Sequence, residues 1–482
     1  MIARVQHNAN WLWLALAFFG IAGALIVLPL TSAVLAIGGA LAALAILRFP
    51  ELALYALVFA VPYGSLFPVS VGAGNLTAVD LLVALVIALW LARMIVQDRA
   101  IVIRWQPLAL PFALFLGAAL LSMTVALSLQ FALKEFAKWA EMFAMYVFVA
   151  NNLDAAKLPR VLAAMFLAGL SEAAIGIYQF LFQAGPAGFI LFDRFMRAFG
   201  TFEQPNPYAG YLGLIAPIAL GVVFTVMSGW WAVGRSNYSL STVHYSLAAL
   251  AAVAFVAMIA ALFMSWSRGA WLGVGAALVI TTVVQSRRAL VLSVIAAFVL
   301  TIVVLLSSIN IIPSVVAERF SGVADYFGVF DVRGVKVNDT NYAIVERMAH
   351  WESAAMMFAA HPLLGVGIGN YAVAYPAYAL PGWSNPLGHA HNYYLNVAAE
   401  AGIIGLVAYL ILWAAAFWQG WRAVRVTRGW QRGVAAGLLG MLVALSVHNG
   451  FDNLFVHGMH VQVGIGLGIV AAMTNFKMTN GK

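Results

Sequence analysis

The chain has 482 residues, of which 64% are hydrophobic and only 9% are charged. A soluble globular protein carries about 25% charged residues, so this composition excludes an ordinary soluble enzyme. The net charge of +8 comes from Lys and Arg residues scattered singly between apolar runs, which argues against nucleic-acid binding, and the lack of cysteine excludes thiolate chemistry.

Apolar runs of about 20 residues recur along the chain, long enough for helices that cross a hydrocarbon core. They do not alternate with polar residues, which excludes the strands of a membrane β-barrel. We therefore predict an all-α polytopic membrane protein with fourteen spans, or twelve if closely spaced pairs in the first third merge or re-enter. In chain order the spans cover residues 11–28, 31–47, 51–67, 77–96, 107–127, 134–151, 159–183, 205–228, 243–265, 268–285, 288–307, 402–424, 432–448 and 458–475.

The basic residues predict the orientation of these spans. Most of the 25 Lys and Arg residues fall in short loops on one side, and cytoplasmic loops are the ones enriched in these residues. Both termini are therefore predicted to be cytoplasmic, with the first apolar run retained because it has no small-residue cleavage site.

One long segment, residues 308–401, contains no convincing span and holds seven of the 17 acidic residues. We predict an N-terminal transmembrane bundle over residues 1–307, a large periplasmic loop over 308–401 and C-terminal transmembrane helices over 402–482. Within the loop, apolar residues at helical spacing predict an amphipathic helix over 341–360, which His361-Pro362 ends.

The boundary between loop and last helices carries the most informative residues. If Asn392 caps the following helix, His391 lies beside the helix N-terminus, where the partial positive charge disfavours imidazolium. A neutral imidazole is what a general base requires. The alternative is that His391 only anchors the loop at the membrane interface.

Four motifs follow one another along the chain. The first is Arg197-Ala198-Phe199-Gly200-Thr201-Phe202-Glu203-Gln204-Pro205-Asn206, and the second is Ser265-Trp266-Ser267-Arg268-Gly269. The third begins at Arg347 and Trp351 and continues through His361-Pro362-Leu363-Leu364-Gly365-Val366-Gly367 to Asn370-Tyr371. The fourth is His391-Asn392, then nine residues, then Gly402 and Gly405. Together they resemble the motifs of the O-antigen ligase family, within the superfamily of O-antigen ligases, polymerases and O-oligosaccharyltransferases.

The resemblance implies a GT-C-like membrane glycosyltransferase of lipopolysaccharide biosynthesis. It would transfer a glycan from undecaprenyl diphosphate to a sugar hydroxyl of lipid A–core at the periplasmic face. It assigns His391 as the base and Arg197, Arg268 and Arg347 as contacts of the donor diphosphate, which guanidinium groups bind in a bidentate manner. The alternatives are that arginines at helix ends reach lipid headgroups, and that Arg347 pairs with loop carboxylates.

Four further residues are candidate supporting groups: His389, Asn392, Asn206 and Asp452. In an extended chain His389 would share a face with His391, but no third metal ligand is evident from the sequence and no Asp-x-Asp pattern occurs. We therefore predict neither a metal nor a cofactor. Asp452 clusters with His448, His457 and His460 near one helical hairpin, where it would orient a histidine, bind acceptor sugar or simply pack at the interface.

Two other functions are compatible with the same residues. An O-antigen polymerase or a protein O-oligosaccharyltransferase would use the same donor and base with a different acceptor. A lipid-glycan flippase or transporter would be expected to show repeated halves and a site at mid-membrane, and neither feature is seen.

Overall fold

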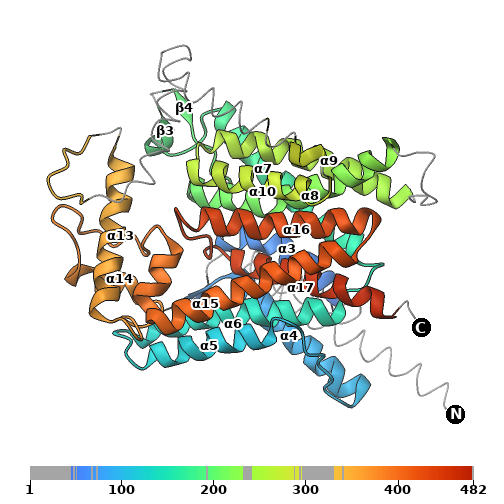
Figure 1. Ribbon diagram of the computed structural model, residues 1–482, viewed down its shortest axis with the longest axis horizontal. Helices are drawn as coiled ribbons and strands as arrows, with labels where there is room; N and C mark the ends of the chain where they lie inside the picture. Colours follow the sequence, from blue (N-terminus) through green and yellow to red (C-terminus); the bar gives the residue numbers. More distant parts are fainter. Residues whose placement is uncertain are drawn as a thin grey trace, which may run out of the picture.

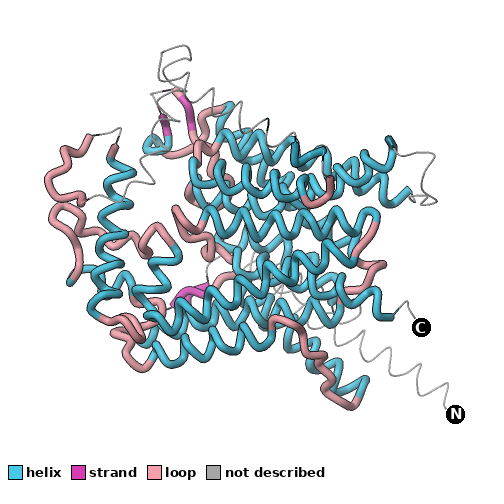
Figure 2. The backbone as a smooth tube through the Cα atoms, viewed as in Figure 1, coloured by secondary structure: helices cyan, strands magenta, loops and turns pink. Residues whose placement is uncertain are grey.

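The computed structural model describes residues 45–46, 49, 51–66, 69–71, 74–191, 194–231, 242–286, 288–291, 295, 331–338 and 341–479. The predicted span over 11–28, and most of those over 31–47 and 288–307, lie outside these residues. The described part is almost entirely helical (Figures 1 and 2). Its strands are two short antiparallel hairpins, β1 (Val69–Val71) with β2 (Gly74–Leu76) and β3 (Ile190–Leu191) with β4 (Phe195–Met196).

The helices follow the predicted apolar runs. In the first half they are α3 (Glu51–Tyr63), η1 (Gly64–Leu66), α4 (Ala78–Arg93), η2 (Met94–Asp98), α5 (Ala109–Met123), α6 (Leu129–Asn152), α7 (Leu158–Leu181), η3 (Ala187–Phe189), α8 (Pro205–Trp231), α9 (Thr242–Met264) and α10 (Arg268–Val283). The second half has α13 (Tyr342–Ala360), α14 (Tyr371–Ala374), η5 (Tyr375–Ala377), α15 (Tyr393–Val426), α16 (Gly429–His448) and α17 (Met459–Thr479).

Six helices within the described residues are long and apolar enough to cross a membrane, and four shorter apolar helices accompany them. The six are Ala78–Val96, Leu158–Leu181, Pro205–Met227, Thr242–Met264, Tyr393–Val426 and Gly429–His448. The chain is therefore an all-α polytopic membrane protein, as predicted. The total of twelve to fourteen spans, the GT-C-like arrangement and the division into three parts stay predictions.

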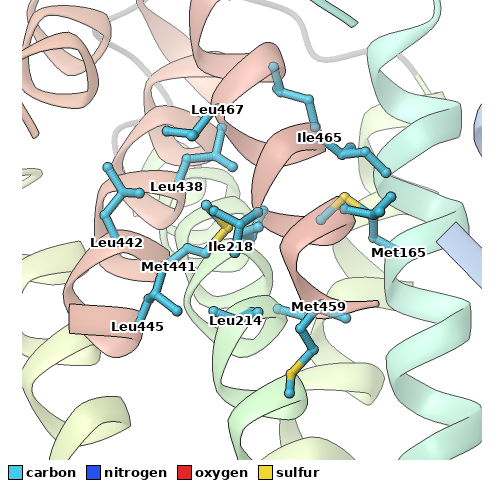
Figure 3. Packing of buried hydrophobic residues seen from close by; sticks show 14 of the residues in the cluster. Met165, Leu214, Ile218, Leu438, Met441, Leu442, Leu445, Met459, Ile465 and Leu467 are labelled. Atoms are coloured by element: carbon cyan, nitrogen blue, oxygen red, sulfur yellow. The ribbon is translucent and has the colours of Figure 1, made fainter. Parts of the chain in front are cut away.

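Small residues let the central helices approach closely. A side chain at Gly221 of α8 would collide with the carbonyl of Gly433 on α16, and one at Gly437 would collide with Ile218. Helices in lipid associate through such small-residue contacts and van der Waals packing. Figure 3 shows the apolar side chains of α8, α16 and α17 around this crossing, including Leu214 and Met441. The packed centre holds the ends of these helices in fixed relative positions.

The α13–α14 segment lies beyond one end of the bundle, next to the last turn of α5 and the first turns of α6 and α15 (Figure 1). As predicted, α13 ends at His361, and Asn392 caps α15 by accepting hydrogen bonds from the backbone N–H groups of Tyr394 and Leu395, each at 3.1 Å. Loops also gather at this end (Figure 2). The candidate residues therefore come together here, outside the helical core.

A break in α15 joins this outer segment to the bundle. Gly402 has φ +62° and ψ −164°, which separates the first turns of α15 from the rest. The break leaves carbonyl groups of α15 without helical hydrogen-bond donors. Backbone N–H groups of the 362–367 turn take the place of those donors. The N–H groups of Val366 and Gly367 donate to the carbonyls of Ala399 and Glu400, both at 2.9 Å.

Candidate functional site

All four motifs meet one turn, residues 449–453, which connects α16 to α17. The backbone N–H of Tyr393, at the start of α15, donates to the Asn449 carbonyl at 2.7 Å. Arg347 Nε donates to the Phe451 carbonyl at 3.3 Å. Gly269, the second residue of α10, packs against Phe451. Segments separated by more than a hundred residues therefore converge on this turn.

Asp452 is the charged centre of the turn and is 5% exposed. Its Oδ1 lies 3.6 Å from His389 Nε2 and 3.7 Å from His391 Nδ1. Its Oδ2 accepts a hydrogen bond from Asn206 Nδ2 at 2.9 Å, and Oδ1 accepts one from the backbone N–H of Asn453 at 2.9 Å. A buried carboxylate is tolerated because it is paired and hydrogen-bonded in this way.

His391 is held in a backbone conformation that few residues with a side chain adopt, with φ +52°. Left-handed backbone at a non-glycine residue stores strain that the surroundings must balance. Trp351 Nε1 of α13 donates to the His391 carbonyl at 3.2 Å and the backbone N–H of His391 donates to His389 Nδ1 at 3.0 Å. Both contacts fix the backbone of His391 beside the ring of His389.

These contacts also determine which ring nitrogens carry protons. His389 Nδ1 accepts a hydrogen bond, so the proton of the neutral ring is on Nε2, which faces Asp452. His391 presents Nδ1 to the same carboxylate, which favours the proton there and leaves the lone pair on Nε2. Both ring nitrogens of His391 are buried and make no hydrogen bond within the described part of the chain. His391 Nε2 is thus set up to accept a proton.

Burial keeps the neighbouring imidazoles neutral. It lowers the pKa of His389 to about 3 and the pKa of His350 to about 4, and the nearby His391 lowers both further. Burial alone would raise the pKa of Asp452, but the interactions with His391, His389 and His448 outweigh it and hold that pKa well below its ordinary value. The site therefore combines a permanent carboxylate charge with neutral imidazoles.

Arg197 is connected to Asp452 through one amide. Arg197 Nη2 donates to Asn206 Oδ1 at 3.1 Å, and the Nδ2 of the same amide donates to Asp452. Arg197 Nε donates to the carbonyl of Ser265 at 2.8 Å, so the first motif is also hydrogen-bonded to the second. In this frame the guanidinium of Arg197 is thus connected by hydrogen bonds, through the Asn206 amide, to the carboxylate that lies against the His389 and His391 rings.

Arg268 and Arg347 border the same frame. Arg268 begins α10, and the adjacent Gly269 also packs against His448, next to the 449–453 turn. Arg347 lies one helical turn before Trp351 on α13, and its Nη1 donates to the Ala343 carbonyl at 2.8 Å. Its contact with the Phe451 carbonyl places it on the 449–453 turn.

The predicted cluster at the α16–α17 hairpin is divided. His448 belongs to the surroundings of Asp452. His460 Nε2 instead lies 2.8 Å from Glu141 Oε2 on α6. The His457 ring packs edge-on against the Phe202 ring, with 5.8 Å between the two centroids. The reason is helical geometry, since His460 lies on the face of α17 that packs against α6.

Among the residues that the structure describes, two groups have the donor atoms of a metal site. His389, His391 and Asp452 form one group, and Asp80, Glu141 and His460 form the other. The sequence offered no third ligand for the histidine pair, and the fold supplies Asp452. However, His389 Nε2 carries its proton because Nδ1 accepts the backbone hydrogen bond, and a protonated nitrogen has no lone pair for a metal. The arrangement of His389, His391 and Asp452 thus suits a carboxylate that faces imidazole N–H groups better than it suits a metal ion.

Sequence reasoning did not single out His350 as a site residue. Its ring lies 5.6 Å from that of His391 and stacks on Tyr375 at 4.7 Å, between centroids. Its Nδ1 lies 2.9 Å from the Tyr371 hydroxyl, which donates to the His350 carbonyl at 3.2 Å, so Nδ1 is the donor of the pair. His350 is buried on α13, but it does not fall on the apolar stripe from which this helix was predicted, so no sequence signal marked it.

Comparison with known proteins bears on this arrangement. A family model described as O-antigen ligase matches residues 253–410. This part of the chain belongs to the O-antigen ligase family. The match makes the protein a glycosyltransferase-type enzyme of the membrane, and it includes Arg268, Arg347 and His391. Asn206 and Asp452 lie outside the matched O-antigen ligase segment, and the fold brings them against it. A search of curated proteins finds no match.

Proposed function

We propose that the protein transfers a glycan from undecaprenyl diphosphate to a sugar hydroxyl of lipid A–core, in lipopolysaccharide biosynthesis. In this proposal His391 is the general base, Asp452 orients it, and Arg197, Arg268 and Arg347 bind the donor diphosphate. The observation that carries it is the frame Arg197–Asn206–Asp452–His391, which joins a phosphate-binding group to a base at the end of the helices.

The chemical step needs one base and a few cations. The acceptor hydroxyl gives its proton to His391 Nε2 as its oxygen bonds to the anomeric carbon. The bond from that carbon to the diphosphate oxygen breaks, and undecaprenyl diphosphate leaves with the electron pair. Asp452 stabilises the imidazolium that forms, as the acid partner of a base commonly does. No second carboxylate is required because diphosphate leaves without protonation.

The arginines have the chemistry that the leaving group needs. A guanidinium stays charged at all physiological pH values and forms paired hydrogen bonds with phosphate oxygens. Ser265 and Asn206 fix the plane of the Arg197 guanidinium, so little ordering remains when a phosphate binds. Preorganised charge of this kind stabilises the negative charge that develops on the leaving oxygen.

The proposed setting is the inner membrane of a bacterium, with both termini in the cytoplasm and the site on the periplasmic side. The distribution of Lys and Arg in the sequence supports this orientation. His391 precedes α15, Asp452 follows α16, and Arg268 begins α10. These positions share one end of the bundle, where a lipid-linked diphosphate would meet water.

An O-antigen polymerase and a protein O-oligosaccharyltransferase are the alternatives with the same donor and base. They differ only in acceptor, and purified protein offered lipid A–core, a nascent glycan and a pilin-like protein in turn would separate them. A flippase would hold its cargo near mid-membrane, whereas the charged residues here gather at one end of the helices.

Substituting the base tests the proposal directly. Purified His391→Ala should bind the lipid-linked donor as wild type does but transfer glycan roughly 10²–10⁴ times more slowly. His244→Ala, on α9 and away from the site, is the matched control and should transfer at the wild-type rate. Full turnover by His391→Ala in the presence of normal donor binding would contradict the assignment.

A further inference from the structure

An apolar groove lies beside the site but outside the frame described above. It has a volume of about 730 Å³, within the range of ligand-binding pockets. Its walls come from the turn after α5, the 361–366 turn and the α14–η5 segment. Leu127 and Leu363 in these walls are 65% and 64% exposed. Apolar surface left uncovered in a hollow of this size is typical of a binding site for an apolar group.

The groove is continuous with the surface that faces lipid. The backbone N–H of Ile403 donates to the Pro362 carbonyl at 2.8 Å, and that of Ile404 donates to the Leu363 carbonyl at 3.4 Å. Both isoleucines are exposed on α15, one of the helices long enough to span the membrane. The rim of the groove is thus hydrogen-bonded to an exposed apolar turn of a helix long enough to span a membrane, which gives a chain in the bilayer a route into it.

Two aromatic rings separate the groove from the base. Ala374 lines the groove, and the next residue, Tyr375, stacks on His350 at 4.7 Å. The centroid of the His350 ring in turn lies 5.6 Å from that of the His391 ring. A lipid whose chain occupies the groove would therefore lie at the same end of the bundle as His391.

We propose that the groove seats an acyl chain of a lipid-anchored acceptor. This inference rests on the proposed transferase function and specifies an acylated acceptor over a protein or a free glycan. The donor's polyprenyl chain fits less well, because it is attached to the diphosphate that the proposal assigns to Arg197, Arg268 and Arg347. None of these arginines lines the groove.

A groove-filling variant tests the proposal. Ala377→Trp should raise the KM for lipid A–core at least tenfold and leave the KM for the same core with its acyl chains removed unchanged. Tenfold corresponds to about 1.4 kcal/mol, the burial of about two methylene groups. Val256→Trp, at a 67% exposed position on α9, is the matched control and should change neither KM. An equal effect of Ala377→Trp on both acceptors, or no effect, would overturn the proposal.

Direct cross-linking separates this proposal from the transferase function. A photoreactive benzoylphenylalanine at position 377 should capture radiolabelled lipid A–core, and unlabelled lipid A–core should compete better than phosphatidylglycerol. Equal competition by the phospholipid would identify an ordinary bilayer lipid and overturn the acceptor site. Transfer to lipid A–core without capture at position 377 would overturn the assignment of the groove but not the transferase function. Capture without transfer to any acceptor would contradict the proposed function.

Discussion

Asn206 shows how one side chain can serve two charged neighbours. Its amide oxygen accepts a hydrogen bond from Arg197, and its amide nitrogen donates one to Asp452. A carboxylate in its place has no donor, and a hydrocarbon has neither group. The amide therefore connects the guanidinium of Arg197 to the carboxylate that faces His391.

Replacing this amide should affect catalysis more than donor binding. Asn206→Asp would place a like charge beside Asp452 and remove the donor, so we expect kcat/KM to fall about 10- to 100-fold. Steady-state kinetics and donor binding measure the two effects separately. Asn385→Asp makes the same change at an exposed position and should be neutral, and an unchanged kcat/KM in Asn206→Asp would exclude the coupling.

The proton positions on His389 bear on the need for a metal. Because His389 Nδ1 accepts the backbone N–H of His391, its Nε2 is a donor toward Asp452. We therefore expect purified protein to keep its transfer activity after extensive treatment with EDTA. A loss of activity that added Mg²⁺, Mn²⁺ or Zn²⁺ restores would show that the proposed metal-independent chemistry is incorrect.

At the scale of elements, the break in α15 determines where His391 sits. Gly402 has a positive φ, and a Cβ there would collide with the backbone of Leu363 and Leu364. The 362–367 turn can therefore bond to the open carbonyls of α15 only if residue 402 is glycine. This explains in physical terms why a glycine stands at that place in the motif.

Gly402→Ala should consequently lower stability by about 2 kcal/mol or more, from backbone strain and the forced shift of the turn. Thermal unfolding in detergent measures the loss, and transfer activity should fall with it. Gly275→Ala on α10 is the matched control, because a Cβ there meets no atom within 4 Å and helical alanine is favoured over glycine. If both variants unfolded at the same temperature as wild type, the role given to the break would be incorrect.

At the scale of the whole molecule, neutral buried histidines make stability depend on pH. The pKa of His389 is about 3 and that of His350 about 4, against 6.5 in an unfolded chain. Between these values the unfolded chain binds protons that the folded chain does not. Stability is therefore complete above pH 6.5 and falls as the pH is lowered toward the folded pKa values.

Lowering the pH from 7 to 5 should destabilise the fold by roughly 2 kcal/mol for each of the two histidines. Unfolding midpoints measured across this range test the expectation. His350→Phe removes one of the groups and should flatten the pH dependence, whereas substitution of the exposed His361 by Gln should not. An equally steep dependence in His350→Phe would mean that another group is responsible.

The apolar runs were enough to predict a helical membrane protein, because lipid leaves the backbone few other choices. Local signals also predicted α13, its end at His361 and the cap at Asn392, since each depends on neighbours within one helical turn. The separation of His460 from Asp452 was not predictable. It depends on which face of α17 packs against α6, and side-chain periodicity alone does not decide between two apolar faces.

By itself the sequence determined the class of the protein, the helices and the residue types capable of base and phosphate chemistry. Only the tertiary structure decided that Asp452 lies against both His389 and His391, that Asn206 connects Arg197 to it, and that His350 lies alongside. These contacts join residues far apart in the chain. Their distances depend on how whole helices pack, which no local pattern of residues encodes.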